Sequence, residues 1–459
     1  MMDFAPLLQP DRGQPARTIT LLTAEGFADW LARQPAATRA LATAQRFAAK
    51  PDTHLLVPHD GEVAVVAGVA KPTGPWALAK LVEALPEGSY RLDGAEVGAN
   101  ALGWLLGQYR FTRYRKGDDT GPRVLLTRDV AHRDEMIRLA AATAQVRDLV
   151  NTGAGDLGPA ELEAEAEALA RTHHAQLMVT SGDALARDYP MIHAVGQAAT
   201  RERAPRLIEL HWGDPAHPRI AIVGKGVCFD TGGLDIKPSA GMRLMKKDMG
   251  GAAHALALAS LVMAARLPVR LHLLIPAVEN AVSAASFRPG DVLKTRKGLT
   301  VENTNTDAEG RLILGDALTR AGEEKPELIL DFATLTGAAR VALGPDLPPL
   351  FTDDEPLAAD LLAAAASEDD PVWRMPLWDG YDDMLKSDIA DMVNAPDGGF
   401  AGAITAALFL RRFVPKDTAW AHLDVFAWRP SGKPGRPKGG DAYALRAAYR
   451  MLKERYLGA

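Results

Sequence analysis

The chain has 459 residues, of which 47% are hydrophobic and 24% are charged, and its formal net charge is −6. This length favours two or three domains with sizeable cores, and the composition is that of an ordinary globular protein. The acidic balance and the lack of a long basic run argue against a dedicated binder of nucleic acid or of an anionic membrane surface. The short basic stretch 432–440 is expected to be a solvated loop.

The single cysteine, Cys228, excludes a disulfide within the chain and suits a reducing compartment. The first residues do not pair a basic segment with an apolar one, so no signal peptide is expected. The longest apolar stretch, 249–265, is rich in alanine, contains a histidine and is shorter than a membrane span. We therefore expect a cytoplasmic protein without membrane segments, and we interpret this stretch as a buried helix.

Residues 1–127 are expected to form a smaller N-terminal α/β domain. Its charged residues are scattered and indicate no chemistry. A helix predicted over 133–151, within the boundary segment 128–151, links this domain to the next one. Within the N-terminal domain, apolar runs predict strands at 53–59, 62–68 and 122–128 and helices at 74–85 and 99–111.

Residues 152–459 are expected to form the larger, chemically active domain. Asp156 is expected to cap a first helix that has Pro159 in its first turn. Strands and helices then alternate, which favours an α/β fold with a mixed, largely parallel sheet flanked by helices on both faces. In such sheets the site lies outside the carboxyl ends of the strands. The predicted strands are 206–212, 219–224, 270–276, 327–334 and 419–426, and the predicted helices are 250–266, 313–323, 337–343, 357–367 and 403–413.

Two segments of this domain carry charged residues in Gly-rich or apolar surroundings. They are "VGKGVCFDTGGLDIKPSAGMRLMKKDMGGAA" (223–253) and "NTDAEGRL" (305–312). A phosphate loop is excluded because Gly226 follows Lys225, where a hydroxyl residue is required. No dinucleotide fingerprint opens a helix, and no G-x-S-x-G nucleophile motif occurs.

Four carboxylates in these segments, Asp230, Asp248, Asp307 and Glu309, would repel one another strongly if they met without cations. Two divalent ions would neutralise them, and paired metals about 3.5–4 Å apart are a recurring device for activating water in hydrolases. Taken singly, each carboxylate fits a helix cap or a surface charge better. Only the joint arrangement favours a two-metal centre.

The two segments resemble the leucine aminopeptidase (cytosol aminopeptidase) family of dinuclear metallo-exopeptidases. "NTDAEGRL" matches the family's signature octapeptide at every position, and "GKG", "FD", "GG", "KPSAGM" and "DMGGAA" match its other metal-binding stretch. The resemblance continues through "DFATLTGA" (331–338), "GAITAALFL" (402–410) and "WAHLD" (420–424). It implies a metal-dependent hydrolase that releases the N-terminal residue of peptides by means of a water activated between two metals.

The resemblance also implies a ligand set for two divalent metals, manganese or zinc. Lys225, Asp230, Asp248 and Glu309 are expected to hold one metal, and Asp230, Asp307 and Glu309 the other. Lysine is an unusual ligand because it must first lose its proton, which a nearby dication and partial burial favour. Metal binding is therefore expected to weaken as the pH falls.

Two cationic residues are expected to act in catalysis. By resemblance, Lys237 directs an ammonium at the carbonyl oxygen of the substrate and at the charge that develops there. Arg311 is expected to hold a bicarbonate ion beside the metals. A guanidinium cannot act as a base at neutral pH, but an anion bound on it can accept the proton of the attacking water.

Substrate contacts are expected at Met245, Thr334 and Gly337, around the side chain of the released residue, and at the backbone of Leu335. These positions fit leucine or another medium-sized apolar side chain. Phe426 departs from the small residues common among relatives and narrows or reshapes this pocket. Lys247 occupies a position where an aromatic residue is common in the family, and Cys228 occupies a position that Thr or Ser often fills. Cys228 is interpreted as a small core thiol, with metal coordination or oxidation as the alternative.

Other interpretations remain open at this stage. One is a dinuclear hydrolase of the dipeptidase or cysteinylglycinase type, and another is a family member with an additional DNA-binding role, for which Lys433, Arg436 and Lys438 are the available charges. The resemblance implies a homohexamer. His254, His272 and His422 are interpreted as hydrogen-bonded core residues. Four tryptophans are interpreted as core or subunit contacts: Trp373, Trp378, Trp420 and Trp428.

Overall fold

The computed structural model describes residues 2–59, 62–117 and 120–458. The chain divides into two compact units, the first made of residues up to Ala144 together with Ser431–Lys438, and the second of Gln145–Pro430 with Gly439 onwards. The boundary between the units falls within helix α5 (Val130–Asn151), which covers the helix predicted at 133–151. Within the part of the chain that the structure describes, no helix is both long and apolar enough to cross a membrane.

The first unit is built around a sheet with the strand order β1-β6-β5-β2-β4-β3, in which only β3 and β4 pair antiparallel. Buried apolar side chains such as Ile19, Val65 and Leu125 come from its central strands. The elements are η1 (Ala5–Leu7), β1 (Leu8–Pro10), β2 (Arg17–Leu22), α1 (Phe27–Ala32), α2 (Ala36–Ala44), β3 (His54–His59), β4 (Glu62–Gly68), α3 (Ala79–Ala84), β5 (Gly88–Leu92), α4 (Asn100–Gly107) and β6 (Arg123–Thr127).

The segment Ser431–Lys438 packs into this first unit. The guanidinium of Arg436 lies 4.3 Å from the ring centroid of Trp76, a cation–π distance. Lys433 and Lys438 are exposed, as expected of a solvated loop, whereas Arg436 is half-buried. The prediction of a wholly solvated loop was therefore wrong at Arg436, because its planar cation packs on an aromatic face.

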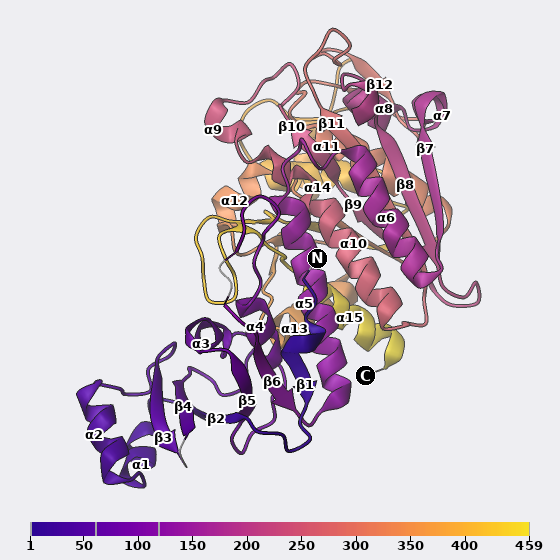
Figure 1. Ribbon diagram of the computed structural model, residues 1–459. Coiled ribbons are helices and arrows are strands. Elements are labelled where there is room, and N and C mark those ends of the chain that lie inside the picture. The colour runs from indigo at the N-terminus through magenta and orange to yellow at the C-terminus, as the bar shows by residue number, and fades with distance from the viewer. Residues whose placement is uncertain (1, 60–61, 118–119, 459) are drawn as a thin grey trace. The chain divides into compact units, whose positions relative to one another are not determined.

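The second unit contains a larger mixed sheet with the strand order β16-β15-β18-β14-β9-β11-β8-β7, and β10 also pairs with β11 (Figure 1). Strands β18, β14, β9, β11 and β10 are joined by parallel pairings, and the antiparallel pairings lie towards the two edges. The predicted α/β fold with a largely parallel sheet is confirmed.

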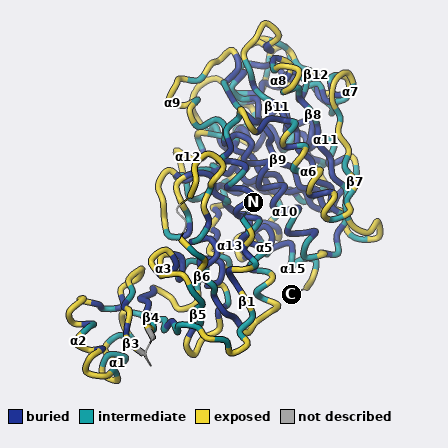
Figure 2. Tube along the Cα trace, viewed as in Figure 1, coloured by how far each residue is buried: buried dark blue, intermediate teal, exposed yellow. Residues whose placement is uncertain are grey.

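Helices cover both faces of this sheet because its central strands are apolar on both sides. Ala221 and Val223 of β9 join a core with α8, α11 and α14, whereas Ile220 and Ile222 alternate to the opposite face. Helix α10 is buried over almost its whole length and packs on β9 and β14, and Figure 2 shows the sheet and α10 as the buried interior.

The second unit contains these elements: α6 (Pro159–His173), β7 (Gln176–Ser181), α7 (Gly182–Asp188), α8 (Pro190–Gly196), η2 (Arg201–Arg203), β8 (Arg206–Trp212), β9 (Arg219–Gly224), β10 (Gly226–Asp230), α9 (Ser239–Met242), η3 (Met245–Met249), α10 (Gly250–Ala264), β11 (Arg270–Asn280), β12 (Val292–Lys294), β13 (Thr300–Glu302), α11 (Glu309–Glu323), β14 (Leu328–Ala333), α12 (Gly337–Leu343), β15 (Pro349–Phe351), α13 (Glu355–Ser367), β16 (Trp373–Arg374), η4 (Asp379–Leu385), β17 (Met392–Val393), α14 (Gly402–Arg411), β18 (Ala419–Asp424), β19 (Trp428–Arg429), β20 (Gly439–Gly440) and α15 (Leu445–Leu457).

Some local predictions differ from the structure. Gly158, not Asp156, is the N-cap of α6, and its backbone N–H donates to the Glu161 carboxylate at 2.8 Å. A carboxylate three residues into a helix satisfies an orphan donor as well as a preceding side chain does. The helices expected at 74–85 and 99–111 are shorter, at Ala79–Ala84 and Asn100–Gly107. Strand β10 was not predicted, because Gly224 and Gly226 on either side of Lys225 suggested that a loop follows β9.

Candidate active site

The candidate site lies where several neighbouring strands of the second unit end. Lys225 directly follows β9, Asp230 ends β10, Thr334 follows β14 and Asp424 ends β18. These strands run parallel, so their carboxyl ends meet at one edge of the sheet. The residues surround a cavity of about 480 Å³.

This cavity brings together all the candidate residues that the sequence indicated. Helix α11 contributes its first turn, η3 contributes the segment before α10, and the loop after β10 contributes a lysine. The candidate residues in the lining are Lys225, Asp230, Lys237, Met245, Asp248, Asp307, Glu309, Arg311, Thr334, Leu335 and Gly337.

Asp230 is held rigidly by two hydrogen bonds to one of its carboxylate oxygens. Its Oδ1 accepts from the backbone N–H of Gly232 and from the side-chain amide of Asn280, each at 2.8 Å. The other oxygen, Oδ2, lies 2.8 Å from the ammonium of Lys237. Gly232 has a φ of +87°, and a Cβ there would lie 3.0 Å from an oxygen of Asp307, so glycine is required for this turn.

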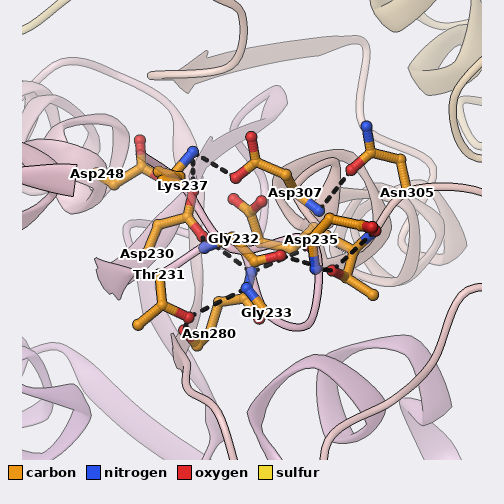
Figure 3. Close-up of polar contacts among 12 residues, drawn as sticks. Asp230, Thr231, Gly232, Gly233, Asp235, Lys237, Asp248, Asn280, Asn305 and Asp307 are labelled. Atoms are coloured by element: carbon orange, nitrogen blue, oxygen red, sulfur yellow. Dashed lines mark hydrogen bonds and ion pairs between the residues drawn. The ribbon is translucent and has the colours of Figure 1, made fainter. Parts of the chain in front are cut away.

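Lys237 lies between two carboxylates that come from different segments. Its ammonium contacts both Asp230 and Asp307, as Figure 3 shows. The loop that carries Lys237 is tied to the loop that carries Asp307, because Thr306 N–H donates to the Asp235 carboxylate at 2.7 Å and Asp235 N–H donates to the Thr306 hydroxyl at 2.8 Å. The two charged motifs of the sequence therefore form one structural unit.

Lys225 makes an equivalent bridge deeper in the site. Its ammonium lies 2.6 Å from Asp248 Oδ2 and 2.9 Å from Glu309 Oε1, and it donates to the Thr334 carbonyl at 3.0 Å. A Cβ at Gly310 would lie 2.5 Å from the Lys225 side chain, so this glycine makes room for it. Two lysines thus pair with four buried or half-buried carboxylates and offset only half of their charge when all four are ionised.

Burial and like charge make two of these carboxyl groups, Glu309 and Asp307, weaker acids than usual. Burial raises the pKa of Glu309 to about 8, and the neighbouring Asp230 carboxylate adds to that rise. Burial also raises the pKa of Asp307 to about 6, again with help from Asp230 and against the nearby Lys237. Burial would raise the pKa of Asp248 as well, but the Lys225 and Lys247 ammoniums lower it overall.

The donor set fits divalent metals. Carboxylate oxygens of Asp230, Asp307 and Glu309 lie within 4.8 Å of one another. Glu309 is 1% exposed, and its Oε2 accepts no hydrogen bond from any described residue. A buried carboxylate oxygen without a partner is costly unless a cation binds it. The cluster therefore has the charge, the ligand type and an unpaired oxygen that a metal centre requires.

Arg311 is buried in the first turn of α11, and burial lowers its pKa to about 10. One guanidinium nitrogen donates to the backbone carbonyl of Asn394 at 2.8 Å, while its buried Nε has no hydrogen-bond partner among the described residues. The guanidinium still carries its charge at neutral pH, and the residue lines the cavity.

Thr334 and Leu335 do more than line the cavity. The Thr334 hydroxyl donates to Asp248 Oδ1 at 2.9 Å and so fixes that carboxylate. The backbone N–H of Leu335 donates to Asp424 Oδ1 at 2.9 Å, and the Thr336 hydroxyl donates to Asp424 Oδ2 at 2.6 Å. Asp424 thereby holds the turn between β14 and α12 in place.

The sequence did not single out Asn280, Asn394 or Asp424 as site residues. Each follows or ends a strand of the second unit, and position at the carboxyl end of a strand was the signal that could have indicated Asn280 and Asp424. Asn394 comes after the short strand β17, which had no recognisable strand pattern.

Phe426 lies in the cavity lining between two cations. The Lys247 ammonium is 5.1 Å and the Arg340 guanidinium 5.0 Å from its ring centroid. Lys247 is buried and also lies 3.6 Å from Asp248 Oδ1. Two of the residues that depart from the expected pattern, Lys247 and Phe426, therefore contact each other in one wall of the cavity.

Three histidines and Cys228 have the core roles that the sequence indicated. His254 accepts from the Tyr443 backbone N–H at 2.9 Å and bonds the Gly250 carbonyl, and His422 bonds Asp331. His272 is buried against Glu209. Cys228 is 1% exposed and does not line the cavity; burial raises the pKa of its thiol well above the usual value.

The four tryptophans differ in exposure. Trp420 is buried and donates to Asp331 at 2.7 Å, and Trp428 is half-buried. Trp373 and Trp378 are 58% and 57% exposed, so they are not core residues of this chain.

Comparison with known proteins agrees with this geometry. The model of the cytosol aminopeptidase family catalytic domain matches residues 144–449, and that of the M17 aminopeptidase N-terminal domain matches residues 18–127. A probable cytosol aminopeptidase of Syntrophotalea carbinolica is 42% identical over 371 residues, covering 77% of this chain and 74% of the relative.

Solved structures give the same result. The cytosol aminopeptidase from Coxiella burnetii is 44% identical with a TM-score of 0.94, over 98% of this chain and all of that one. The bottromycin maturation enzyme BotP in complex with Mn is 33% identical with a TM-score of 0.86, over 98% of this chain and all of that one. A mutant of tomato leucine aminopeptidase is 28% identical with a TM-score of 0.84, over 97% of this chain and 95% of that one. The chain belongs to the cytosol aminopeptidase family and is a metal-dependent aminopeptidase.

Proposed function

We propose that the chain releases the N-terminal residue of peptides with two divalent ions, manganese or zinc, held by the carboxylate cluster. The observation that carries this proposal is the meeting of four carboxylates and two lysines in one cavity, with a buried Glu309 oxygen left unpaired. Two such ions supply a nucleophilic water at neutral pH and polarise the scissile carbonyl. The similarity to BotP, which was solved in complex with Mn, supports manganese as the first metal to test.

Five residues hold the metals in this proposal. Asp230 and Glu309 contribute to both positions, and the remaining ligands are Lys225 and Asp248 at one and Asp307 at the other. The contacts of Lys225 with Asp248 and Glu309 support the first grouping, and those of Lys237 with Asp230 and Asp307 support the second. Lys225 ligates only as the neutral amine, so its proton leaves when dications take over the charge of the carboxylates.

Lys237 serves as the electrophilic cation. Its ammonium is the more solvent-accessible of the two lysines, with 15% of its side chain exposed compared with 3% for Lys225. Once its carboxylate partners bind metal, Lys237 is free to donate to the carbonyl oxygen of the substrate and to the negative charge that develops on it.

Arg311 positions an anionic base, for which bicarbonate is the proposed occupant. Its unpaired Nε and its fixed contact with the Asn394 carbonyl support this role, because a guanidinium held at one nitrogen presents the others in a defined direction. An anion held by Arg311 would supply a base for the proton of the attacking water.

A free N-terminus is selected because only a neutral α-amine can ligate a metal beside the scissile carbonyl. We propose that Met245, Thr334 and Gly337 surround the side chain of the released residue, and that the backbone of Leu335 lies against the reacting group. All four line the cavity, and space is open around the Gly337 Cα. Leucine or another medium-sized apolar residue is the proposed preference.

The experiment is hydrolysis of leucine p-nitroanilide by the manganese-reconstituted protein. We expect chromophore release that o-phenanthroline or EDTA suppresses and added manganese restores. A protein that binds no metal and stays inactive with manganese would refute the proposal. Comparison of free and N-blocked tripeptides with dipeptides separates this activity from a strict dipeptidase, which would leave tripeptides intact.

We also propose a homohexamer in the cytoplasm, as the family resemblance implies. The exposed Trp373 and Trp378 support subunit contacts, since large apolar side chains this exposed favour interfaces. Light scattering at micromolar concentration tests the assembly, and a monomer would contradict it.

A further inference from the structure

A second cluster of metal-ligating side chains lies on β8 and β11, outside the cavity. His272 is close to the start of β11, and Asn280, which faces the carboxylate cluster, is its last residue. The eight residue steps from position 272 to position 280 correspond to about 26 Å of strand. The second cluster is therefore separate from the active site.

Strand pairing brings these side chains onto one face of the sheet. His211 of β8 and His272 of β11 are directly opposite each other in the antiparallel register, and Glu209 lies two residues before His211. The two imidazole rings are stacked, with centroids 4.2 Å apart and planes within 20°. Ligand atoms of Glu209, His211 and His272 all lie within 4.8 Å of one another. Cross-strand neighbours and alternate residues of one strand are suited to a shared ligand.

The hydrogen bond of His272 decides which of its nitrogens is available. Its Nε2 lies 3.1 Å from the Glu209 carboxylate, which can only accept, so Nε2 carries the proton. In the neutral ring Nδ1 then has a free lone pair. This atom is buried and has no hydrogen-bond partner in the described chain, and it lies 3.9 Å from Glu324 Oε2. A carboxylate that binds the far nitrogen of a histidine is the usual support for a metal-ligating imidazole.

Arg320 forms ion pairs with both carboxylates of the cluster, those of Glu209 and Glu324. Its Nε lies 2.9 Å from Glu209 Oε1 and its Nη2 lies 3.0 Å from Glu324 Oε1. The second oxygen of Glu324 is therefore left on the side of the imidazoles. Arg219, another cation nearby, donates to the Glu324 backbone carbonyl at 2.7 Å. A cavity of about 10 Å³ is lined by His211, His272 and Glu324 together with the side chains Arg219 and Arg270, which is about the space of one water or ion.

We infer that His211, His272 Nδ1 and Glu324 form a binding site for a transition-metal dication of the zinc class, with Glu209 fixing the His272 tautomer. Two imidazoles and one carboxylate suit zinc better than magnesium or calcium, which prefer oxygen ligands. Zinc–nitrogen bonds of about 2.0–2.1 Å place tetrahedral ligand atoms about 3.3 Å apart. His272 Nδ1 and Glu324 Oε2 are already 3.9 Å apart, and binding requires the two imidazoles to rotate out of their stack so that the ion lies in the plane of each ring. The bound ion would cross-link β8, β11 and the end of α11.

Zinc retention tests this site in the full-length protein. The protein is equilibrated with excess zinc, desalted and analysed for metal per chain, and it is compared with His211→Phe, which keeps the stacked ring but removes the ligand. His217→Phe removes an imidazole from the loop after β8 and is the matched control. We expect His211→Phe to retain one zinc ion fewer than wild type and His217→Phe to retain the same number. Equal zinc content in all three proteins would overturn the inference.

A measurement on the wild-type chain covers the case in which His211→Phe does not fold. Anomalous diffraction at the zinc edge from zinc-soaked crystals with manganese in the active site should show a peak within bonding distance of His211 and His272 Nδ1, and no peak there would overturn the inference. This test is independent of the proposed peptidase mechanism. Asp307→Ala should lower the metal content of the active site without changing zinc binding at His211 and His272.

Discussion

The side-chain amide of Asn394 donates to the backbone carbonyl of Asn305 at 2.7 Å. Its amide oxygen accepts from the Thr304 backbone N–H at 2.8 Å, and its own backbone carbonyl accepts from Arg311. Asn394 is fully buried. Asn394 therefore ties the loop that leads to Asp307, through its side chain, to the guanidinium beside the active site, through its backbone carbonyl.

Asn394→Ala should weaken the site without removing any residue that contacts substrate. Buried donors and acceptors lose their partner, at a cost of about 1–3 kcal/mol for each group left unpaired. We expect a lower melting temperature and weaker manganese binding, together with a reduced kcat. Asn394→Asp keeps the acceptor for Thr304 and should lose less metal affinity than Asn394→Ala. Equal manganese affinity in wild type and Asn394→Ala would contradict this role.

Lys237→Ala and Asp307→Ala should separate catalysis from metal binding. Loss of an electrostatic stabiliser of the transition state lowers kcat by about 10²–10³-fold. Lys237 pairs with Asp230 and Asp307 but is not one of the proposed metal ligands. Lys237→Ala should therefore keep full metal content, and Asp307→Ala should lose metal. The control is Lys386→Ala, at an exposed lysine paired with Asp383, which should leave kcat unchanged. Metal loss in Lys237→Ala would refute the assigned role.

Metal affinity should fall as the pH falls. In the metal-free chain the pKa of Glu309 is raised to about 8 and that of Asp307 to about 6, so these groups hold protons below those values. A metal must displace each proton, which weakens binding about tenfold per pH unit and per proton. The manganese Kd should therefore rise as the pH falls, already above pH 8 because Lys225 also gives up a proton, more steeply below about pH 8 and more steeply still below about pH 6. Competition titration with a chelating dye measures it, and a Kd independent of pH over this range would contradict the electrostatics.

Phe426→Ala should widen the specificity of the released residue. The Phe426 ring forms one wall of the cavity, between Lys247 and Arg340. Each additional methylene group of the substrate that a pocket accommodates raises kcat/KM by about tenfold or more. We expect kcat/KM for large apolar residues to rise relative to alanine by about tenfold. Phe400 also lines the cavity but is 84% exposed, so Phe400→Ala is the matched control. If Phe426→Ala has the same preference for the released residue as wild type, Phe426 does not shape the pocket for that residue.

A buried ion network should dominate the acid sensitivity of the second unit. Arg147 and Arg429 each pair with Asp441, at 2.9 and 2.8 Å. Burial would raise the pKa of Asp441, but the two arginines lower it overall, so its stabilising contribution is present above the ordinary Asp pKa and is lost as the pH falls through the lowered value. Asp441→Ala leaves two buried cations and should cost about 3–5 kcal/mol in urea unfolding. A loss below about 1 kcal/mol would show that the network is unimportant.

Most of the larger fold could be predicted because its strands are long apolar runs that alternate with helices. β9, β8 and α12 agree with the predicted residues at both ends. Short strands such as β17 and β20 have two residues each and depend on partners far away in the chain, so no local period identifies them. β10 was missed because glycines at its start suggested a loop.

The candidate site residues could be named from the sequence because their motifs match a known family. The residues that hydrogen-bond to them could not be named in this way. Asn280 reaches Asp230 across 50 positions, and Asp424 reaches Leu335 across 89. Such partners are brought together only by the order of strands in the sheet. Lys247 and Phe426, noted separately as departures, proved to be in contact, and no local pattern could have indicated that pairing.

Anomalous diffraction from manganese-soaked crystals tests the two-metal centre most directly. We predict two peaks about 3.5–4 Å apart, both within bonding distance of Asp230 and Glu309, with Lys237 displaced from Asp307. A single peak elsewhere, or carboxylates still paired only with the two lysines in the presence of saturating manganese, would contradict it.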